Sequence, residues 1–143
     1  MGLFGPLEVS ASALTAERLR LDVIANNLAN ANTTRTPEGG PYRRQVVVFA
    51  PRTDEGSGWP LADRGAGGGV RVVGIMPDSA PLRRVYNPGH PDADAEGYVT
   101  MPNVDPVVEM VDLIAATRAY EANVTVITET KNMALRALEL LRG

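Results

Sequence analysis

Apolar residues recur at alternating spacings of three and four near the start of the chain. The series contains two polar members and runs Leu7, Ser10, Leu14, Glu17, Leu21, Ile24, Leu28, Ala31. This spacing places the side chains on one face of a helix. Because the residue before a proline is pushed out of the helical region, we expect this helix to end at Thr36-Pro37.

A longer series of the same kind occupies the end of the chain. It runs Met110, Leu113, Thr117, Tyr120, Val124, Ile127, Lys131, Ala134, Leu138, Leu141. Asp105 can cap this helix, and Pro106 suits its first position because a missing N–H is harmless there. At 1.5 Å per residue the helix would be roughly 54 Å long. A domain of this size cannot cover such a helix with its own core, so we expect neighbouring chains to cover part of it.

Asparagines fill the positions between the apolar residues of the first helix. Asn26, Asn27, Asn30 and Asn32 lie within seven residues of one another. Asparagine is a weak helix former because its amide competes for nearby backbone groups. We therefore expect this stretch to be weakly folded until its amides find partners on adjacent helices.

The middle of the chain has a different composition from its two ends. Between Thr36 and Pro102 lie 11 of the 14 glycines and 9 of the 11 prolines. Within it, β-branched runs at 43–50 and 70–76 predict strands, and 82–86 is a weaker candidate. The segment 54–69, with the single tryptophan Trp59, is typical of a flexible loop.

Together these patterns predict an α+β fold. The N- and C-terminal helices pair as an antiparallel coiled coil, and a small β-rich module is inserted between them. The expected division is 1–35 and 104–143 for the helical segments of one inner domain, with 36–103 as the Gly/Pro-rich β module. The residues predicted to pack against other subunits are Leu14, Leu21, Ile24, Asn26, Asn27, Leu28, Asn30, Met110, Leu113, Tyr120, Asn123, Val124, Ile127 and Leu138.

Charge and composition argue against several classes of function. The 143 residues carry 14 Lys+Arg and 17 Asp+Glu, with no basic run, so a nucleic-acid partner is not expected. No stretch of about 18 apolar residues predicts a membrane span. The first six residues lack the cationic start and apolar core of a secretory signal.

The side chains that usually carry catalysis are scarce. There is no cysteine, and His90 is the only histidine, so the common zinc sites are excluded. Asp92, Asp94 and Glu96 lack the later bidentate glutamate of a calcium loop. No serine lies in a nucleophile motif, and no lysine follows the glycines at 67–69. We therefore expect no enzyme activity, no metal and no cofactor.

Two blocks at opposite ends of the chain resemble the flagellar axial proteins. Ala25–Thr33 (ANNLANANT) is similar to the ANNIANxxT signature of rod and hook subunits. Glu109–Leu113 (EMVDL) and Arg118–Asn123 (RAYEAN) resemble the C-terminal helix of the same proteins. In the middle, 35–44, 86–94 and 97–104 look most like the C-type proximal rod proteins. The resemblance covers about three quarters of the chain.

This resemblance implies a structural subunit of the bacterial flagellar basal-body proximal rod, the torque-transmitting shaft that crosses the periplasm. It implies polymerisation through the terminal helices and export through the flagellar type III apparatus. The implied partners are copies of itself, other proximal and distal rod subunits, and the rod–ring junction protein. A soluble coiled-coil adaptor or chaperone of a secretion system, which does not polymerise, is the alternative.

Overall fold

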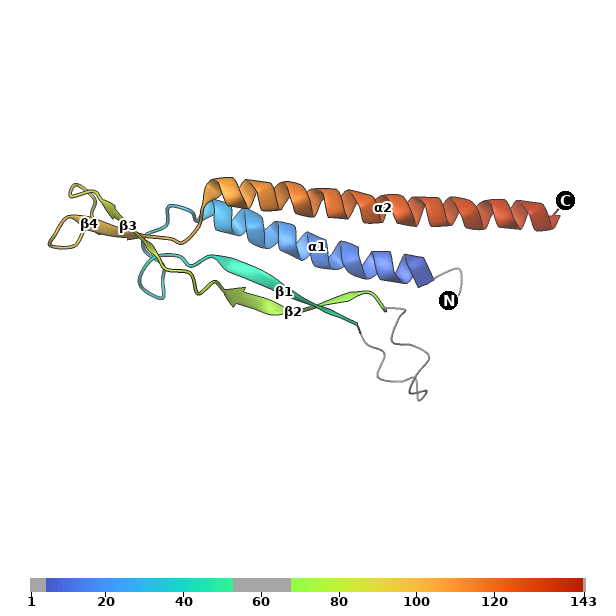
Figure 1. Cartoon of the computed structure of the whole chain (residues 1–143), viewed down its shortest axis with the longest axis horizontal. Helices are drawn as coiled ribbons and strands as arrows, with labels where there is room; N and C mark the ends of the chain where they lie inside the picture. Colours follow the sequence, from blue (N-terminus) through green and yellow to red (C-terminus); the bar gives the residue numbers. More distant parts are fainter. Residues whose placement is uncertain (1–4, 53–67, 143) are drawn as a thin grey trace, which may run out of the picture. The chain divides into compact units, whose positions relative to one another are not determined.

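The computed structural model describes residues 5–52 and 68–142. Within them the elements are α1 (Gly5–Ala29), β1 (Gln45–Pro51), β2 (Val70–Pro77), β3 (Arg83–Tyr86), β4 (Tyr98–Met101) and α2 (Pro106–Arg142) (Figure 1). Two long terminal helices with short strands between them confirm the α+β class. Most of the predicted loop at 54–69, including Trp59, lies outside the described residues.

Helix α1 ends at Ala29, earlier than the Thr36-Pro37 boundary expected from the sequence. The side-chain amide of Asn30 donates to the Asn26 carbonyl at 2.9 Å, and the Ala31 N–H bonds the Leu28 carbonyl at 3.3 Å. The first is a local bond by which asparagine competes with a continuing helix, and the second is the i−3 backbone bond of a tightened last turn. The asparagines therefore end the helix before the proline is reached.

Helix α2 begins as the sequence predicts. The Asp105 carboxylate accepts the Val107 N–H at 2.9 Å, and the Asp105 carbonyl accepts the Glu109 N–H at 3.0 Å. This is the geometry of an N-terminal cap, which satisfies N–H groups that lack a partner within the helix.

The strands form two two-stranded sheets. β1 pairs with β2, and the Arg52–Gly69 and Arg44–Asp78 hydrogen bonds at its two ends are those of an antiparallel pair. β3 pairs antiparallel with β4. The three predicted strands are confirmed, with boundaries shifted by one or two residues. The sequence prediction missed β4, a four-residue strand with only Val99 buried.

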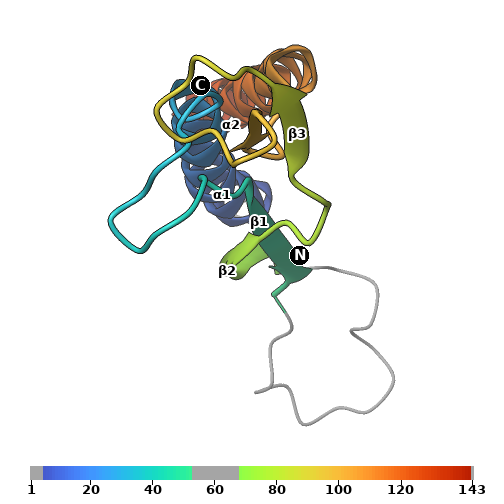
Figure 2. The same cartoon turned by 90° about the vertical axis from the view of Figure 1, so that its left-hand side faces the viewer.

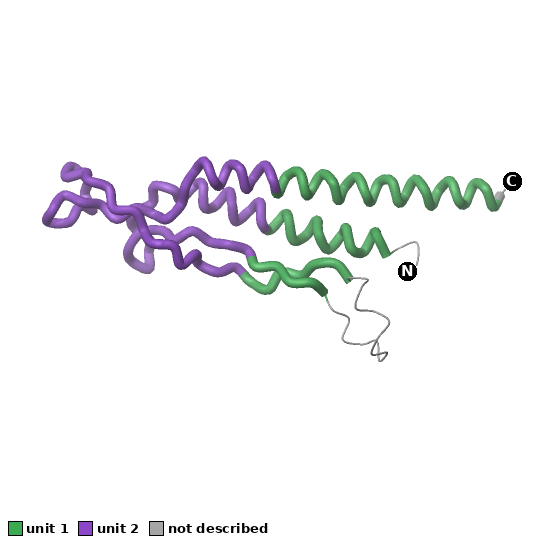
Figure 3. The backbone as a smooth tube through the Cα atoms, viewed as in Figure 1, with its two compact units in different colours: residues 1–19, 48–74, 116–143 green, residues 20–47, 75–115 purple. Residues whose placement is uncertain are grey.

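The chain divides into two compact units, shown in green and purple in Figure 3. Unit 1 comprises 1–19, 48–74 and 116–143, and unit 2 comprises 20–47 and 75–115. Each unit contains helical and strand segments. The division at residues 35 and 103 stays a prediction.

In unit 1 the start of α1 holds the start of β2. The Ser12 hydroxyl donates to the Val9 carbonyl at 2.7 Å and accepts the Val70 N–H at 3.0 Å. The most buried helical residues of this unit are small or polar: Ser10, Ala16, Ala116 and Thr130. Small buried residues allow a helix backbone to approach its neighbours closely.

In unit 2 the end of α1 lies against the start of α2 (Figures 1 and 2). Asn27 contacts Glu109, and the earlier residue Arg20 contacts the later residue Asp112. The two segments therefore run antiparallel here, in agreement with the predicted pairing. The apolar core of the unit is small and consists of Val23, Ile24, Ala31, Val99 and Val104.

Candidate functional site

The first three turns of α2 carry charged side chains on their inner side and apolar side chains on their outer side. Glu109 is fully buried, whereas Val107 is 71% exposed. Because successive helical residues turn by about 100°, Glu109, Asp112 and Leu113 share one side and Val107, Met110, Val111 and Ile114 lie roughly opposite. A globular surface helix has the reverse arrangement.

The inner side belongs to a polar cluster, which we define as Asn27, Tyr42, Arg44, Asp78, Glu109 and Asp112. Both Glu109 carboxylate oxygens have partners: the Arg44 Nε–H donates to Oε1, and the Asn27 amide donates to Oε2 at 3.1 Å. A buried carboxylate is tolerated only when it is paired and hydrogen-bonded. The cluster meets that condition.

Asn27 joins α1 to β1 and α2 through its side chain. Its amide also donates to the Gln45 carbonyl at 2.8 Å, and its oxygen accepts the Gln45 N–H and the Tyr42 hydroxyl, each at 2.9 Å. The donors and acceptors of this side chain are thus used within the chain. Only 1% of the surface of Asn27 is exposed, and its role in subunit packing stays a prediction.

Arg44 is the centre of the cluster. Besides Glu109, its guanidinium pairs with Asp78 at 3.3 Å and with Asp112 at 3.0 Å. Its own N–H donates to the Asn103 side chain at 2.8 Å, which fixes the chain just before β1. One arginine therefore ties α2 to the residues just before β1 and just after β2.

These contacts shift the pKa values of three residues in the cluster. Burial opposes the charge on Arg44, but the hydrogen bond and charge of Glu109, with Asp78 and Asp112, raise its pKa above the ordinary value. Burial, and then the negative charge of Glu109, raise the pKa of the Tyr42 hydroxyl. The hydrogen bond from the Ala80 N–H lowers the pKa of Asp78. Desolvation opposes this, and Arg44 adds to the lowering. These shifts favour a charged Arg44, a charged Asp78 and a neutral Tyr42 at neutral pH.

The outer side of these turns, which we call the outer α2 face, consists of Val107, Met110, Val111 and Ile114. Their exposed fractions are 71%, 55%, 61% and 59%. Single exposed apolar residues are ordinary, but four at spacings of three and four form a continuous stripe. Such a stripe is typical of a helix that packs against another helix.

The structure spreads the predicted packing residues over three degrees of burial. Ile24 and Asn27 are buried. Half-buried are Leu14, Leu21, Leu28, Asn30, Leu113, Tyr120, Asn123 and Ile127, and exposed are Asn26, Met110, Val124 and Leu138. In this set only Met110 belongs to the outer α2 face.

The side chains of Asn26, Asn27 and Asn30 in the asparagine-rich stretch form hydrogen bonds within the chain. Asn26 donates to the Tyr42 hydroxyl at 3.3 Å and accepts the Asn30 amide at 3.1 Å, and Asn30 also accepts the Thr33 hydroxyl at 3.1 Å. The sequence had suggested partners on adjacent helices, and Glu109 of α2 is such a partner for Asn27. The other partners differ, because Tyr42 and Gln45 return to α1, a contact that no local pattern indicates.

Sequence reasoning also missed Val107, Val111 and Ile114. Their signal was present, because 107, 111 and 114 have helical spacing. The ten-member series that includes Met110 and Leu113 was the longer one, and it does not contain these three residues. Glu109 was visible only as part of a family motif.

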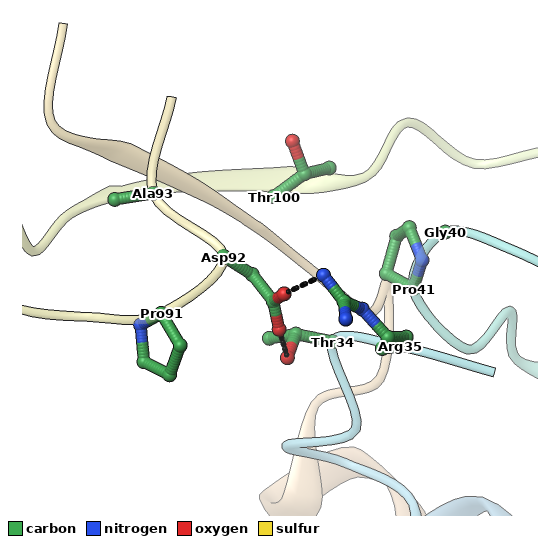
Figure 4. A pocket seen from close by; sticks show the side chains of 8 residues that line it. All are labelled: Thr34, Arg35, Gly40, Pro41, Pro91, Asp92, Ala93 and Thr100. Atoms are coloured by element: carbon green, nitrogen blue, oxygen red, sulfur yellow. Dashed lines mark hydrogen bonds and ion pairs between the residues drawn. The ribbon is translucent and has the colours of Figure 1, made fainter. Parts of the chain in front are cut away.

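A surface cleft of about 400 Å³ lies beside the β3–β4 hairpin in unit 2 and includes Thr34, Arg35, Gly40 and Asp92 (Figure 4). The Asp92 carboxylate binds the Arg35 guanidinium at 2.7 Å and accepts the Thr34 hydroxyl at 2.8 Å. The cleft therefore holds an ion pair that ties two loops together.

The remaining acidic residues of this region are also paired. Asp94 binds Arg84 at 2.7 Å, and the His90 Nδ1 accepts the Asp92 N–H at 3.0 Å. Among the described residues no group of three potential ligands could hold a metal ion. Within the same residues, no helix is long and apolar enough to cross a membrane.

Acid is expected to loosen the β3–β4 hairpin at Asp94. The hydrogen bond from the Tyr98 N–H lowers the pKa of Asp94 below its ordinary value of 3.8. Desolvation opposes this, and Arg84 and the Glu96 N–H add to the lowering. A carboxylate whose pKa is lower in the folded than in the unfolded chain stabilises the fold at pH values above its ordinary pKa. This stabilisation is lost as the pH falls through the pKa of the folded state. The Tyr98 amide shift, followed by NMR, should titrate below pH 3.8 and stop titrating there in Asp94→Asn. A midpoint at or above the ordinary value would contradict this.

Comparison with known proteins confirms the resemblance. Residues 7–35 match the family described as Flagella basal body rod protein, and residues 95–140 match the Flagellar basal body rod FlgEFG protein C-terminal family. The first region covers most of α1, and the second covers most of α2, including its inner side and the outer α2 face.

Full-length relatives agree with both family matches. The chain is 53% identical to the flagellar basal-body rod protein FlgC of Borreliella burgdorferi, with 100% of both chains covered. It is 49% identical to FlgC of Bacillus subtilis, covering 98% of this chain and 99% of the relative. It is 45% identical to FlgC of Salmonella typhimurium, covering 98% of each. The chain therefore belongs to the FlgC family of flagellar basal-body rod proteins.

Proposed function

We propose that this chain, a structural subunit of the flagellar basal-body rod, polymerises through its terminal helices and uses the outer α2 face as an intersubunit contact. Its neighbours would be copies of itself, other proximal and distal rod subunits, and the rod–ring junction protein. The proposed role is to transmit torque without catalysis. Export through the flagellar type III apparatus belongs to the same proposal.

One observation carries the proposal: the outer α2 face is apolar although it is exposed. Fully burying a side chain of this kind is worth about 1.5 to 3 kcal/mol, so covering the exposed halves of four such residues would contribute several kcal/mol. Repeated along a polymer, contacts of this size suit a shaft that must not come apart under torque. Contacts that do not close a ring build a helical array.

The domain arrangement follows from the same idea. We propose that 1–35 and 104–143 form the inner coiled-coil domain of the rod and that 36–103 form a β-rich module outside it. The other predicted packing residues that remain exposed, Asn26, Val124 and Leu138, are candidates for further contacts between helices.

Val111→Asp tests the proposed contact. Position 111 is 61% exposed, so a charge there should leave the monomer folded, because surface substitutions change stability by only about 0.5 kcal/mol. In the assembled rod the carboxylate would be buried without a partner, which should abolish incorporation. Circular dichroism of the monomer, rod incorporation and swimming are the measurements. Val111→Thr, which keeps the shape without the charge, is the control.

The outcomes separate the competing functions. A folded, exported Val111→Asp chain that is absent from the rod supports the proposal. Normal incorporation and swimming would show that the outer α2 face is not a contact. A wild-type chain that binds one partner and never forms fibres, whatever its concentration, would favour the adaptor.

A further inference from the structure

We propose that the polar cluster sets the rotation of the first three turns of α2 and thereby keeps the outer α2 face turned away from α1. Hydrophobic burial within a single chain would favour the opposite setting, with Val107, Met110, Val111 and Ile114 against α1. Glu109 and Arg44 are then positioning residues. They hold an apolar surface ready for a partner and prevent the chain from covering it itself.

The geometry ties the rotation to the contacts of one residue. Glu109 reaches Asn27 and Arg44 at once, and these lie on α1 and just before β1. Turning this part of α2 to bury Val107 or Ile114 would carry Glu109 away from both. Arg44 would then lose its bond to Glu109. One N–H of the Asn27 amide would lose its acceptor.

A second contact fixes the same setting one turn later. Asp112 binds the Arg44 guanidinium at 3.0 Å and lies 4.0 Å from the Arg20 guanidinium. Glu109 and Asp112 are three residues apart and therefore share a side of the helix. Two anchors on the same side define a rotation, whereas one would allow the helix to turn about it.

The apolar side chains on the inner side are few. Leu113 is half-buried, and Ala116, the next residue on this side, is buried but carries only a methyl group. Buried ionic groups that specify one packing arrangement over another are a known use of such interactions. Here the specified arrangement exposes the more apolar side of the helix.

The chain has no cysteine, so single introduced thiols report the rotation without interference. Val111→Cys places a thiol on the outer side and Leu113→Cys places one on the inner side. In the otherwise unchanged monomer, a maleimide reagent should label position 111 about tenfold faster than position 113. Labelling is then repeated in Glu109→Leu and in Glu109→Gln, which keeps hydrogen-bonding atoms at the same place.

We expect Glu109→Leu to lower or reverse the ratio of labelling rates while helix content stays unchanged, and Glu109→Gln to preserve the ratio. Asp112→Leu, with Asp112→Asn as its control, repeats the test at the more exposed anchor. An unchanged ratio in both leucine variants would overturn the proposal. Loss of helix with fast labelling at both positions in both variants would also overturn it, because the cluster would then maintain folding and not rotation. The test uses monomers, so its result is independent of whether the outer α2 face is a rod contact.

Discussion

Arg44→Ala is expected to lower the free energy of unfolding by about 3 kcal/mol, because it leaves the buried Glu109 carboxylate without its charged partner. Glu109 has no exposed surface, and the Asn27 amide alone cannot compensate its charge. Asp78 and Asp112 would lose the same partner, but both lie nearer to solvent and should contribute less. Urea unfolding followed by circular dichroism measures the change.

Arg43→Ala is the matched control for this experiment. Arg43 precedes Arg44, is exposed, and donates to the Asp78 carbonyl at 3.4 Å. Its removal should change stability by no more than about 0.5 kcal/mol. Equal losses from the two variants would show that net charge, and not the polar cluster, accounts for the effect.

The second large effect is expected in unit 1, where Gly69→Ala should cost about 2 to 4 kcal/mol. Gly69 has φ +95°, a conformation that favours glycine, and an added Cβ would overlap the Ser12 hydroxyl and lie 3.1 Å from the Ser12 Cβ. The substitution would therefore strain the backbone and push β2 away from α1. Thermal or urea unfolding detects the loss.

Gly74→Ala separates this effect from a general cost of replacing glycine in β2. A Cβ at position 74 meets nothing within 4 Å, and the residue does not have a positive φ. Reduced freedom of the unfolded chain could even stabilise the protein by about 0.4 to 1 kcal/mol. If Gly74→Ala were as destabilising as Gly69→Ala, the contact with Ser12 would not be the cause.

The helices and most strands were predictable because their signals are local. The Asp105-Pro106 start of α2 and the runs at 43–50 and 70–76 depend on neighbours in sequence, and the structure confirms them. The prediction that α1 ends at Thr36-Pro37 is wrong, because the side chain of Asn30 bonds the Asn26 carbonyl and the helix ends at Ala29.

The polar cluster could not be predicted in the same way. Arg44 and Glu109 are 65 residues apart, and Asn27 and Glu109 are 82 apart. No pattern of spacing brings them together, and a glutamate in a helix is usually exposed. The outer α2 face was within reach, because Val107, Val111 and Ile114 have helical spacing. To identify it as the exposed side, one must know which side of α2 packs against the rest of the chain.

A cryo-electron microscopy map of basal bodies assembled with this chain tests the central claim most directly. The account predicts a helix of an adjacent subunit packed on the outer α2 face, in contact with Val107, Met110, Val111 and Ile114. It also predicts that Glu109 keeps its bonds to Arg44 and Asn27 within the same subunit. A map in which the outer α2 face borders solvent, while other surfaces make every intersubunit contact, would contradict the account.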